Sequence, residues 1–321
     1  MLVLTAGVAL APVRATLANG GVSLIRDAEI ESTLRRMSAP IFEAAGLGPD
    51  AVDIYIVNDE RLNAFVAGGQ NLFLNTGLLM RSETPAQLLG VIAHEVGHIA
   101  GGHLSRLPGA QERAGIEMIL ATVLGAAAAV AGAPDLGTAI MSGGATYAQG
   151  NLMAFSRSQE QSADQAALGY LQQAGVPSQG LLDVLEILDG QNALAVSASS
   201  PYLRSHPLTR DRMLFVQNHV ANQPQQPEVP EPWVDAHRRM VVKLDAFLRE
   251  PRVVLDRYPA GAGVTARYAR AIALYRLPDL ERALSEIDGL IALHPEDPYF
   301  HELKGQMLFE HGQVEKAIAR A

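Results

Sequence analysis

The sequence predicts a mainly α-helical chain with a small β-sheet in its first part and an all-α segment in its second part. Apolar residues recur at helical spacing within residues 85–100 and 156–171, whereas residues 70–74 alternate as a strand does. A stretch with four prolines, residues 221–232, separates the two parts. With 321 residues, 48% of them hydrophobic, the chain is long enough for two domains with buried cores.

The first of these helices has a well-marked start. Thr84 suits the N-cap, Pro85 suits the first helical position, and Gln87 completes a capping box. Apolar side chains then continue through the motif His-Glu-Val-Gly-His at residues 94–98. The motif therefore lies on a helix that buries much of its surface.

The motif has the spacing of a zinc site. His94 and His98 are four residues apart, so both rings project from one face and can share a tetrahedral zinc ion. Glu95 points beside that ion, where it can take a proton from the attacking water instead of acting as a ligand. His103 lies about 140° around the helix from His98, so we expect it to be a surface residue or a neighbour of a ligand. A metzincin would need a histidine at position 104, which is Leu104.

A second helix, within residues 156–171, supplies the missing ligand. Glu160 and Asp164 are four residues apart and lie on one face of it. Glu160 completes a His-His-Glu set and leaves a fourth position open. Asp164 lies one turn further on and can accept the outer N–H of a ligand histidine, with His94 as the first choice. The alternative for both carboxylates is an ordinary solvated helix face.

The two motifs together resemble the gluzincin peptidase family of the CAAX prenyl protease, the heat-shock protease HtpX and the β-barrel assembly-enhancing proteases. The resemblance is strongest to the periplasmic, tetratricopeptide-repeat-containing branch. Residues 63–79 resemble the family's edge-strand segment, and residues 205–212 resemble its His-Pro motif, so the resemblance covers residues 50–215. It implies an α+β zincin-like metalloprotease domain over residues 21–220.

The resemblance also implies the roles of individual residues in a zinc metalloendopeptidase. One Zn²⁺ per chain is expected on His94, His98 and Glu160, with Glu95 as the general base. The segment from Gln70 would bind an extended substrate as an added strand. The residues expected to bind substrate are Asn63, Gln70, Asn71, Leu72 and Phe73.

His206 has more than one possible role. With Arg212 it could stabilise the oxyanion, as the family resemblance implies. It could instead fill the fourth metal position and keep the enzyme silent until a loop moves. A turn histidine before Pro207 is the third possibility, and the sequence does not choose between the first two.

Charge and the N-terminal segment indicate the partners and the compartment. The formal net charge is −9 and no basic cluster occurs, which argues against a nucleic-acid partner. The absence of cysteine is compatible with either redox compartment. Residues 1–20 are expected to be a signal peptide of a periplasmic protein, although a positive n-region is missing. A first buried strand or helix is the alternative.

One further segment is strongly apolar. Residues 118–133 carry no charge and are rich in alanine and glycine, but a spanning helix needs about 20 strongly apolar residues. We therefore expect residues 115–145 to form a flexible hydrophobic lid over the active site. Contact with a membrane would be peripheral at most.

The second part of the chain, residues 233–321, shows an internal repeat. Small and large apolar residues recur 34 residues apart, as in Ala271 and Gly305, which is the period of tetratricopeptide repeats. Residues 264–297 make one full unit and a second begins at residue 298. Fewer than three repeats rarely stand alone, so the chain is expected to be a fragment or to be capped by neighbouring helices.

Two functions follow. The first is a periplasmic zinc endopeptidase that cleaves unfolded or misassembled outer-membrane proteins, with the repeats docking substrates or the outer-membrane assembly machinery. The alternative is a repeat-based binding or chaperone module with a latent protease domain. The intact Glu95 favours the enzyme.

Overall fold

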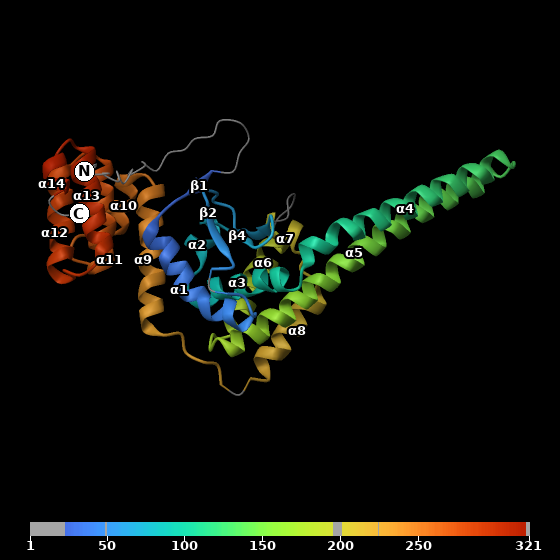
Figure 1. Cartoon of the computed structure of the whole chain (residues 1–321), viewed down its shortest axis with the longest axis horizontal. Helices are drawn as coiled ribbons and strands as arrows, with labels where there is room; N and C mark the ends of the chain where they lie inside the picture. Colours follow the sequence, from blue (N-terminus) through green and yellow to red (C-terminus); the bar gives the residue numbers. More distant parts are fainter. Residues whose placement is uncertain (1–22, 49, 195–200, 224, 319–321) are drawn as a thin grey trace, which may run out of the picture.

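The computed structural model describes residues 23–48, 50–194, 201–223 and 225–318 (Figure 1). The expected signal peptide at residues 1–20 lies outside them. In chain order the described elements are β1 (Leu24–Ile25), α1 (Ala28–Ala44), β2 (Asp53–Val57), β3 (Ala64–Ala67), β4 (Asn71–Asn75), α2 (Thr76–Arg81), α3 (Pro85–Ala100), α4 (His103–Val130), α5 (Pro134–Gln173), α6 (Gln179–Leu194), α7 (Pro201–Ser205), α8 (Arg210–Ala221), α9 (Glu231–Leu248), α10 (Pro251–Arg257), α11 (Val264–Arg276), α12 (Leu280–Leu293), α13 (Pro298–Glu310) and α14 (Val314–Ile318). The predicted class, a mainly helical α+β chain, is confirmed.

The sheet has the strand order β1-β2-β4-β3. β4 pairs with β2 in parallel and with β3 in antiparallel fashion, so it lies inside the sheet. The prediction that the segment from Gln70 to Phe73 is an edge strand is therefore wrong. Alternation of apolar residues reports which face of a strand is buried, not whether its backbone is already paired. The free edge beside α3 belongs to β3.

The helix α3 is the centre of the first core. Its N-terminus is as predicted: the Thr84 hydroxyl accepts from the Gln87 backbone N–H at 3.3 Å, and Pro85 occupies the first turn. Every residue from Pro85 to His98 is buried, with α1, α5, α6 and β3 packed around the helix. Such enclosure explains why the apolar residues of this helix are not confined to one stripe.

A glycine sets the distance between α3 and α5. A Cβ on Gly97 would lie 2.8 Å from the Ala163 carbonyl oxygen and 3.0 Å from the Ala163 Cα. Only a residue without a side chain allows this approach. The contact lies beside His98 on one helix and Asp164 on the other, so it determines how closely the two motifs meet.

The segment expected to be a lid has a different structure. α4 and α5 form a long antiparallel helical hairpin whose far half projects away from the body (Figure 1). Residues 115–145 make up the outer part of this hairpin and do not cover the active site, so the lid prediction is wrong. The segment is apolar, as its sequence indicates, but it forms a protrusion instead of a cover over the active site.

The helix α9 joins the two parts of the chain. Met240 and Leu244 belong to the core around α3, whereas Val242 and Ala246 belong to a second core built with α11, α12 and α13. Close to them, the Lys243 ammonium lies 2.8 Å from Asp27 and 2.9 Å from Glu29, two acidic residues at the start of α1. These contacts attach the helical segment to the first core.

The second core has the expected period. α11 begins at residue 264 and α13 at residue 298, while α12 begins at residue 280 and α14 at residue 314. Each pair of starts is 34 residues apart, the length of a tetratricopeptide unit.

The glycine contact between α3 and α5 makes a testable prediction. Gly97→Ala forces the helices apart, so we expect the affinity of the two motifs for a metal ion to fall at least tenfold and the free energy of unfolding to fall by about 1–3 kcal/mol. Gly169→Ala, on α5 with no atom within 4 Å of its added Cβ, is the control and should leave both unchanged or improve stability slightly. Chelator competition and thermal unfolding measure the two effects. Wild-type metal affinity in Gly97→Ala would show that the motifs do not depend on this contact.

Candidate metal centre

Four side chains from three parts of the chain converge in the first core. The ligand atoms of His94, His98, Glu160 and His206 all lie within 4.8 Å of one another, and all four residues are buried. The Nε2 atoms of His94 and His98 are 3.1 Å apart. Glu160 places a carboxylate oxygen 3.3 Å from a ring nitrogen of each histidine. The structure thus brings together the three residues predicted as ligands and adds His206.

Each side chain is positioned by its own element. α3 presents His94 and His98 one turn apart, and α5 presents Glu160. His206 follows α7, where its backbone N–H donates to the Tyr202 carbonyl and its ring stacks on the Tyr202 ring at 4.6 Å. The stacking aims Nδ1 of His206 at the cluster, 3.3 Å from Nε2 of His94.

The chemistry of this cluster suits a metal ion. Nitrogen and oxygen donors from three imidazoles and a carboxylate form the set that borderline cations prefer. Beside it, both carboxylate oxygens of Glu95 and Nε2 of His206 are buried without a hydrogen-bond partner, and Oε1 of Glu95 lies 3.4 Å from that nitrogen. Buried polar atoms are normally satisfied, so these groups indicate a site that binds further polar species.

Asp164 and Arg212 support the cluster from behind. Asp164 is fully buried and accepts from Nδ1 of His94 at 2.8 Å, which directs Nε2 of that ring into the cluster. Arg212 donates to Asp164 through Nε at 2.6 Å and Nη2 at 2.9 Å, and Nη1 lies 3.0 Å from Glu160. Nη1 also donates to the Pro207 carbonyl at 2.9 Å. These acceptors engage the guanidinium, so in this structure Arg212 holds Asp164, Glu160 and the Pro207 carbonyl together, while the oxyanion role implied by the family resemblance stays a prediction.

The surrounding charges make the site strongly receptive to a cation. Burial disfavours the charged form of His94, but hydrogen bonds to Asp164 and Glu160 outweigh it and raise the pKa of His94 to about 10. Burial opposes ionisation of Glu160, yet the rings of His206, His94 and His98 hold the pKa of its carboxyl well below its usual range. The ionised carboxylates of Glu160 and Asp164 therefore favour positive charge at His94, whereas burial lowers the pKa of His98.

His103 lies behind the second histidine. α3 ends at Ala100, and Gly102, with φ +60°, turns the chain so that His103 starts α4. Its Nδ1 lies 2.9 Å from Nδ1 of His98, and burial, with His98 and Arg106 nearby, lowers the pKa of His103 to about 4. If His98 donates this hydrogen bond, its Nε2 keeps a free lone pair for a metal. His103 is thus the neighbour of a candidate ligand. The angle of about 140° between His98 and His103 does not apply, because α3 ends at Ala100.

The residues expected to bind substrate are spread over the sheet. Asn63 immediately precedes β3, where its carbonyl accepts from the Asn75 N–H at 3.1 Å and its Oδ1 is buried without a partner. Gln70 is exposed in the turn before β4, and Asn71 donates to the Gly68 carbonyl in the same turn. Leu72 is fully buried. Phe73 stacks between the rings of Tyr55 and Phe65. Leu72 is therefore a core residue and cannot contact substrate.

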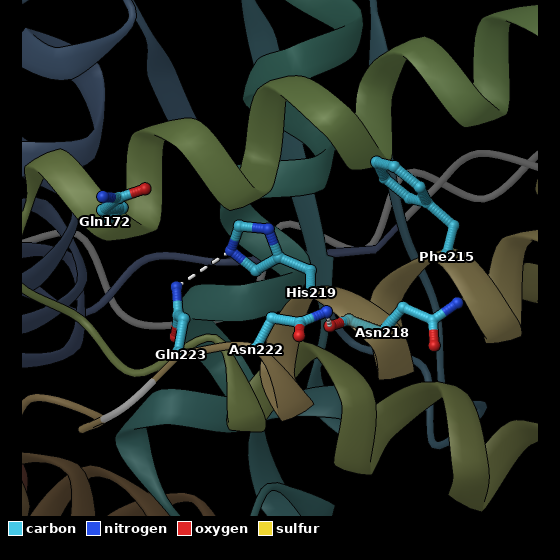
Figure 2. A pocket seen from close by; sticks show the side chains of 6 residues that line it. All are labelled: Gln172, Phe215, Asn218, His219, Asn222 and Gln223. Atoms are coloured by element: carbon cyan, nitrogen blue, oxygen red, sulfur yellow. Dashed lines mark hydrogen bonds between the residues drawn. The ribbon is translucent and has the colours of Figure 1, made fainter.

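A separate pocket of about 450 Å³ lies between α5 and α8 (Figure 2). His219 in this pocket is hydrogen-bonded to Gln223 at 2.9 Å. Gln172, at the end of α5, also lines it, about 18 Å along the helix from Glu160. The pocket contains no carboxylate among its lining residues, so it does not extend the metal centre.

Comparison with known proteins agrees with this geometry. The family model of Peptidase family M48 matches residues 25–220. A β-barrel assembly-enhancing protease of Yersinia pestis is 28% identical over 277 residues, which cover 83% of this chain and 55% of the relative. The protein of the same name in Escherichia coli (strain K12) is 24% identical over 307 residues, which cover 94% and 62%. The chain thus spans little more than half the length of these curated relatives. The match over most of the chain, together with the buried metal-binding cluster, makes this chain a member of Peptidase family M48.

Proposed function

We propose that the chain is a zinc-dependent endopeptidase that cleaves unfolded or misassembled outer-membrane proteins in the periplasm. The observation that carries this proposal is the buried cluster of His94, His98, Glu160 and His206 with the unpartnered carboxylate of Glu95 beside it. The names of the relatives support a role in β-barrel assembly. Three nitrogens and one carboxylate oxygen match a four-coordinate zinc site.

The chain supplies both the zinc ligands and the proton transfer. A bound zinc ion would polarise the scissile carbonyl and lower the pKa of the attacking water towards about 7. Glu95 takes the proton from this water and passes it to the leaving amine, for which both of its oxygens are free. Arg212 and Asp164 keep Glu160 and His94 oriented throughout.

Substrate binds along β3 in this proposal. Asn63 and Asn75 form a hydrogen-bonded pair. Hydrogen-bonded and non-hydrogen-bonded pairs alternate along an antiparallel ladder, so the backbone groups of Ala64 and Val66 point away from β4, although both residues are buried. An extended polypeptide added there would lie beside α3, which packs against β3. Folded proteins cannot present such a strand, so unfolded chains are favoured.

His206 serves as a resting ligand in this proposal. Its Nδ1 is as close to Glu160 as the ring nitrogens of His94 and His98 are, so it completes the coordination set. Since water must then displace it, His206 restrains cleavage until its loop moves.

The repeat-like helices α11 to α14 would dock substrates or the outer-membrane assembly machinery. Their attachment through α9 holds them beside the protease core. A binding or chaperone module with a latent protease is the alternative function, and the position of His206 among the other candidate ligands is the observation that favours it.

Glu95→Gln separates catalysis from metal binding. We expect zinc content to stay at one per chain while casein cleavage falls by about 10²–10⁴-fold, because the base is lost and the ligands remain. His94→Ala should lose both zinc and casein cleavage. Glu186→Gln, on the exposed surface of α6, is the control and should keep both. Zinc loss in Glu95→Gln would reassign that residue as a ligand.

Val66→Pro tests the β3 edge. It removes an N–H that faces the free edge while leaving the ladder to β4, so kcat/KM for an unfolded substrate should fall by about tenfold. Val66→Ala loses packing but keeps the N–H, and its activity relative to its zinc content is the reference. Equal kcat/KM in the two variants would remove β3 as the substrate strand.

His206→Ala distinguishes the two roles of that residue. Loss of a resting ligand should raise basal casein turnover, compared at matched zinc loading. Loss of an oxyanion donor would instead lower kcat by about 10²–10³-fold with little change in KM. His219→Ala, in the pocket of Figure 2, is the control.

A further inference from the structure

The hairpin of α4 and α5 is not used by the proposed chemistry. We define its tip as residues 118–156, between Glu117 and Arg157, and the only charged residue in the tip is Asp135. Among the described residues, α4 is the one helix long and apolar enough by length and composition to cross a membrane, and little of its apolar stretch is buried. The tip projects beyond the rest of the molecule (Figure 1).

Large apolar side chains point outward from both helices of the tip. The exposed ones are Met118, Ile119, Leu120, Val123, Leu124, Val130, Leu136, Met141, Tyr147 and Met153. On α4 most of them occupy the arc that faces away from α5. A water-exposed hairpin of this kind would be unusual, because monomers rarely display large apolar patches.

The inside of the tip is built largely from small residues, with the Met141 side chain packed over Gly125. Ala121 packs directly against Gly144, and Gly125 packs against Gly137, so the two backbones approach closely. A hairpin in water buries its large side chains and exposes small or polar ones. The tip does the opposite, which is the arrangement of helices in an apolar solvent.

Four hydroxyl groups of the tip are satisfied within their own helices. Thr122, Thr138, Ser142 and Thr146 each donate to the carbonyl four residues earlier, at 2.9 to 3.0 Å. These side chains therefore carry no unmet need for water. A protein partner would cover one face, whereas the exposed apolar residues lie on both helices.

We propose that the tip of the α4–α5 hairpin inserts into the hydrocarbon layer of a lipid bilayer. Along α4 the distance from Met118 to Val130 is roughly 18 Å, so the tip enters from one side and does not cross a core of about 30 Å. Glu117 and Asn151 mark the polar boundary at one level, since their side chains hydrogen-bond at 3.1 and 3.2 Å. Apolar burial, not attraction to anionic headgroups, drives the binding.

Flotation of the full chain with phosphatidylcholine vesicles tests the proposal. Wild type should float with the vesicles, and Leu124→Glu should lower the bound fraction at least tenfold. Leu293→Glu is the matched control, because Leu124 is 59% and Leu293 is 60% exposed, and it should bind as wild type does. Absence of wild-type binding, or equal losses in the two variants, would overturn the proposal.

Asp135→Asn adds a test in the opposite direction. Removing the only charge of the tip should tighten vesicle binding at least tenfold, and unchanged or weaker binding would count against insertion. A wild-type dimer that Leu124→Glu converts to monomer, without vesicle binding, would assign the tip to a second copy instead. Cleavage is not measured in these experiments, so their failure would leave the peptidase proposal standing.

Discussion

The buried carboxylate of Asp164 is the interaction on which the centre of this protein depends. An ionised carboxylate away from water costs several kcal/mol unless charged partners surround it. Arg212 of α8 and His94 of α3 supply these partners, so one carboxylate on α5 fixes three helices. Burial raises the pKa of Asp164, but the hydrogen bonds from Arg212 and His94 outweigh it and keep the pKa lowered. Arg212 also holds the Pro207 carbonyl and so places His206 beside the other ligands.

The helix α5 connects the metal centre to the protruding part of the α4–α5 hairpin. α5 runs without interruption from Pro134 to Gln173, with its first half in the hairpin and Glu160 and Asp164 in the core. Asn151, at the polar boundary of the tip, lies roughly 14 Å before Glu160 along α5. A tip inserted in a bilayer would therefore hold the metal centre close to the membrane surface.

The features of the fold and the site that could be predicted from the sequence are those set within a single helix or strand. The N-terminal cap of α3, the shared face of His94 and His98, and the one-turn spacing of Glu160 and Asp164 all follow from local sequence and helical geometry. Local sequence did not predict three features: the pairing of β4 on both sides, the direction of the α4–α5 hairpin, and the partners of Arg212. Each of these depends on a segment distant in sequence, for which local periodicity carries no signal. The double glycine at residues 101–102 was a usable sign that α3 would end before His103.

The sequence by itself determined which chemical groups this protein brings to a metal site, because ligand type and spacing along a helix are local properties. It also determined the 34-residue period and the apolar character of the α4–α5 segment. Only the tertiary structure decided that β3 is the free edge, that Arg212 braces Asp164, and that the apolar segment extends outward. The physical reason is that a side chain's type is inherited from the sequence, whereas its partner depends on which helices pack together.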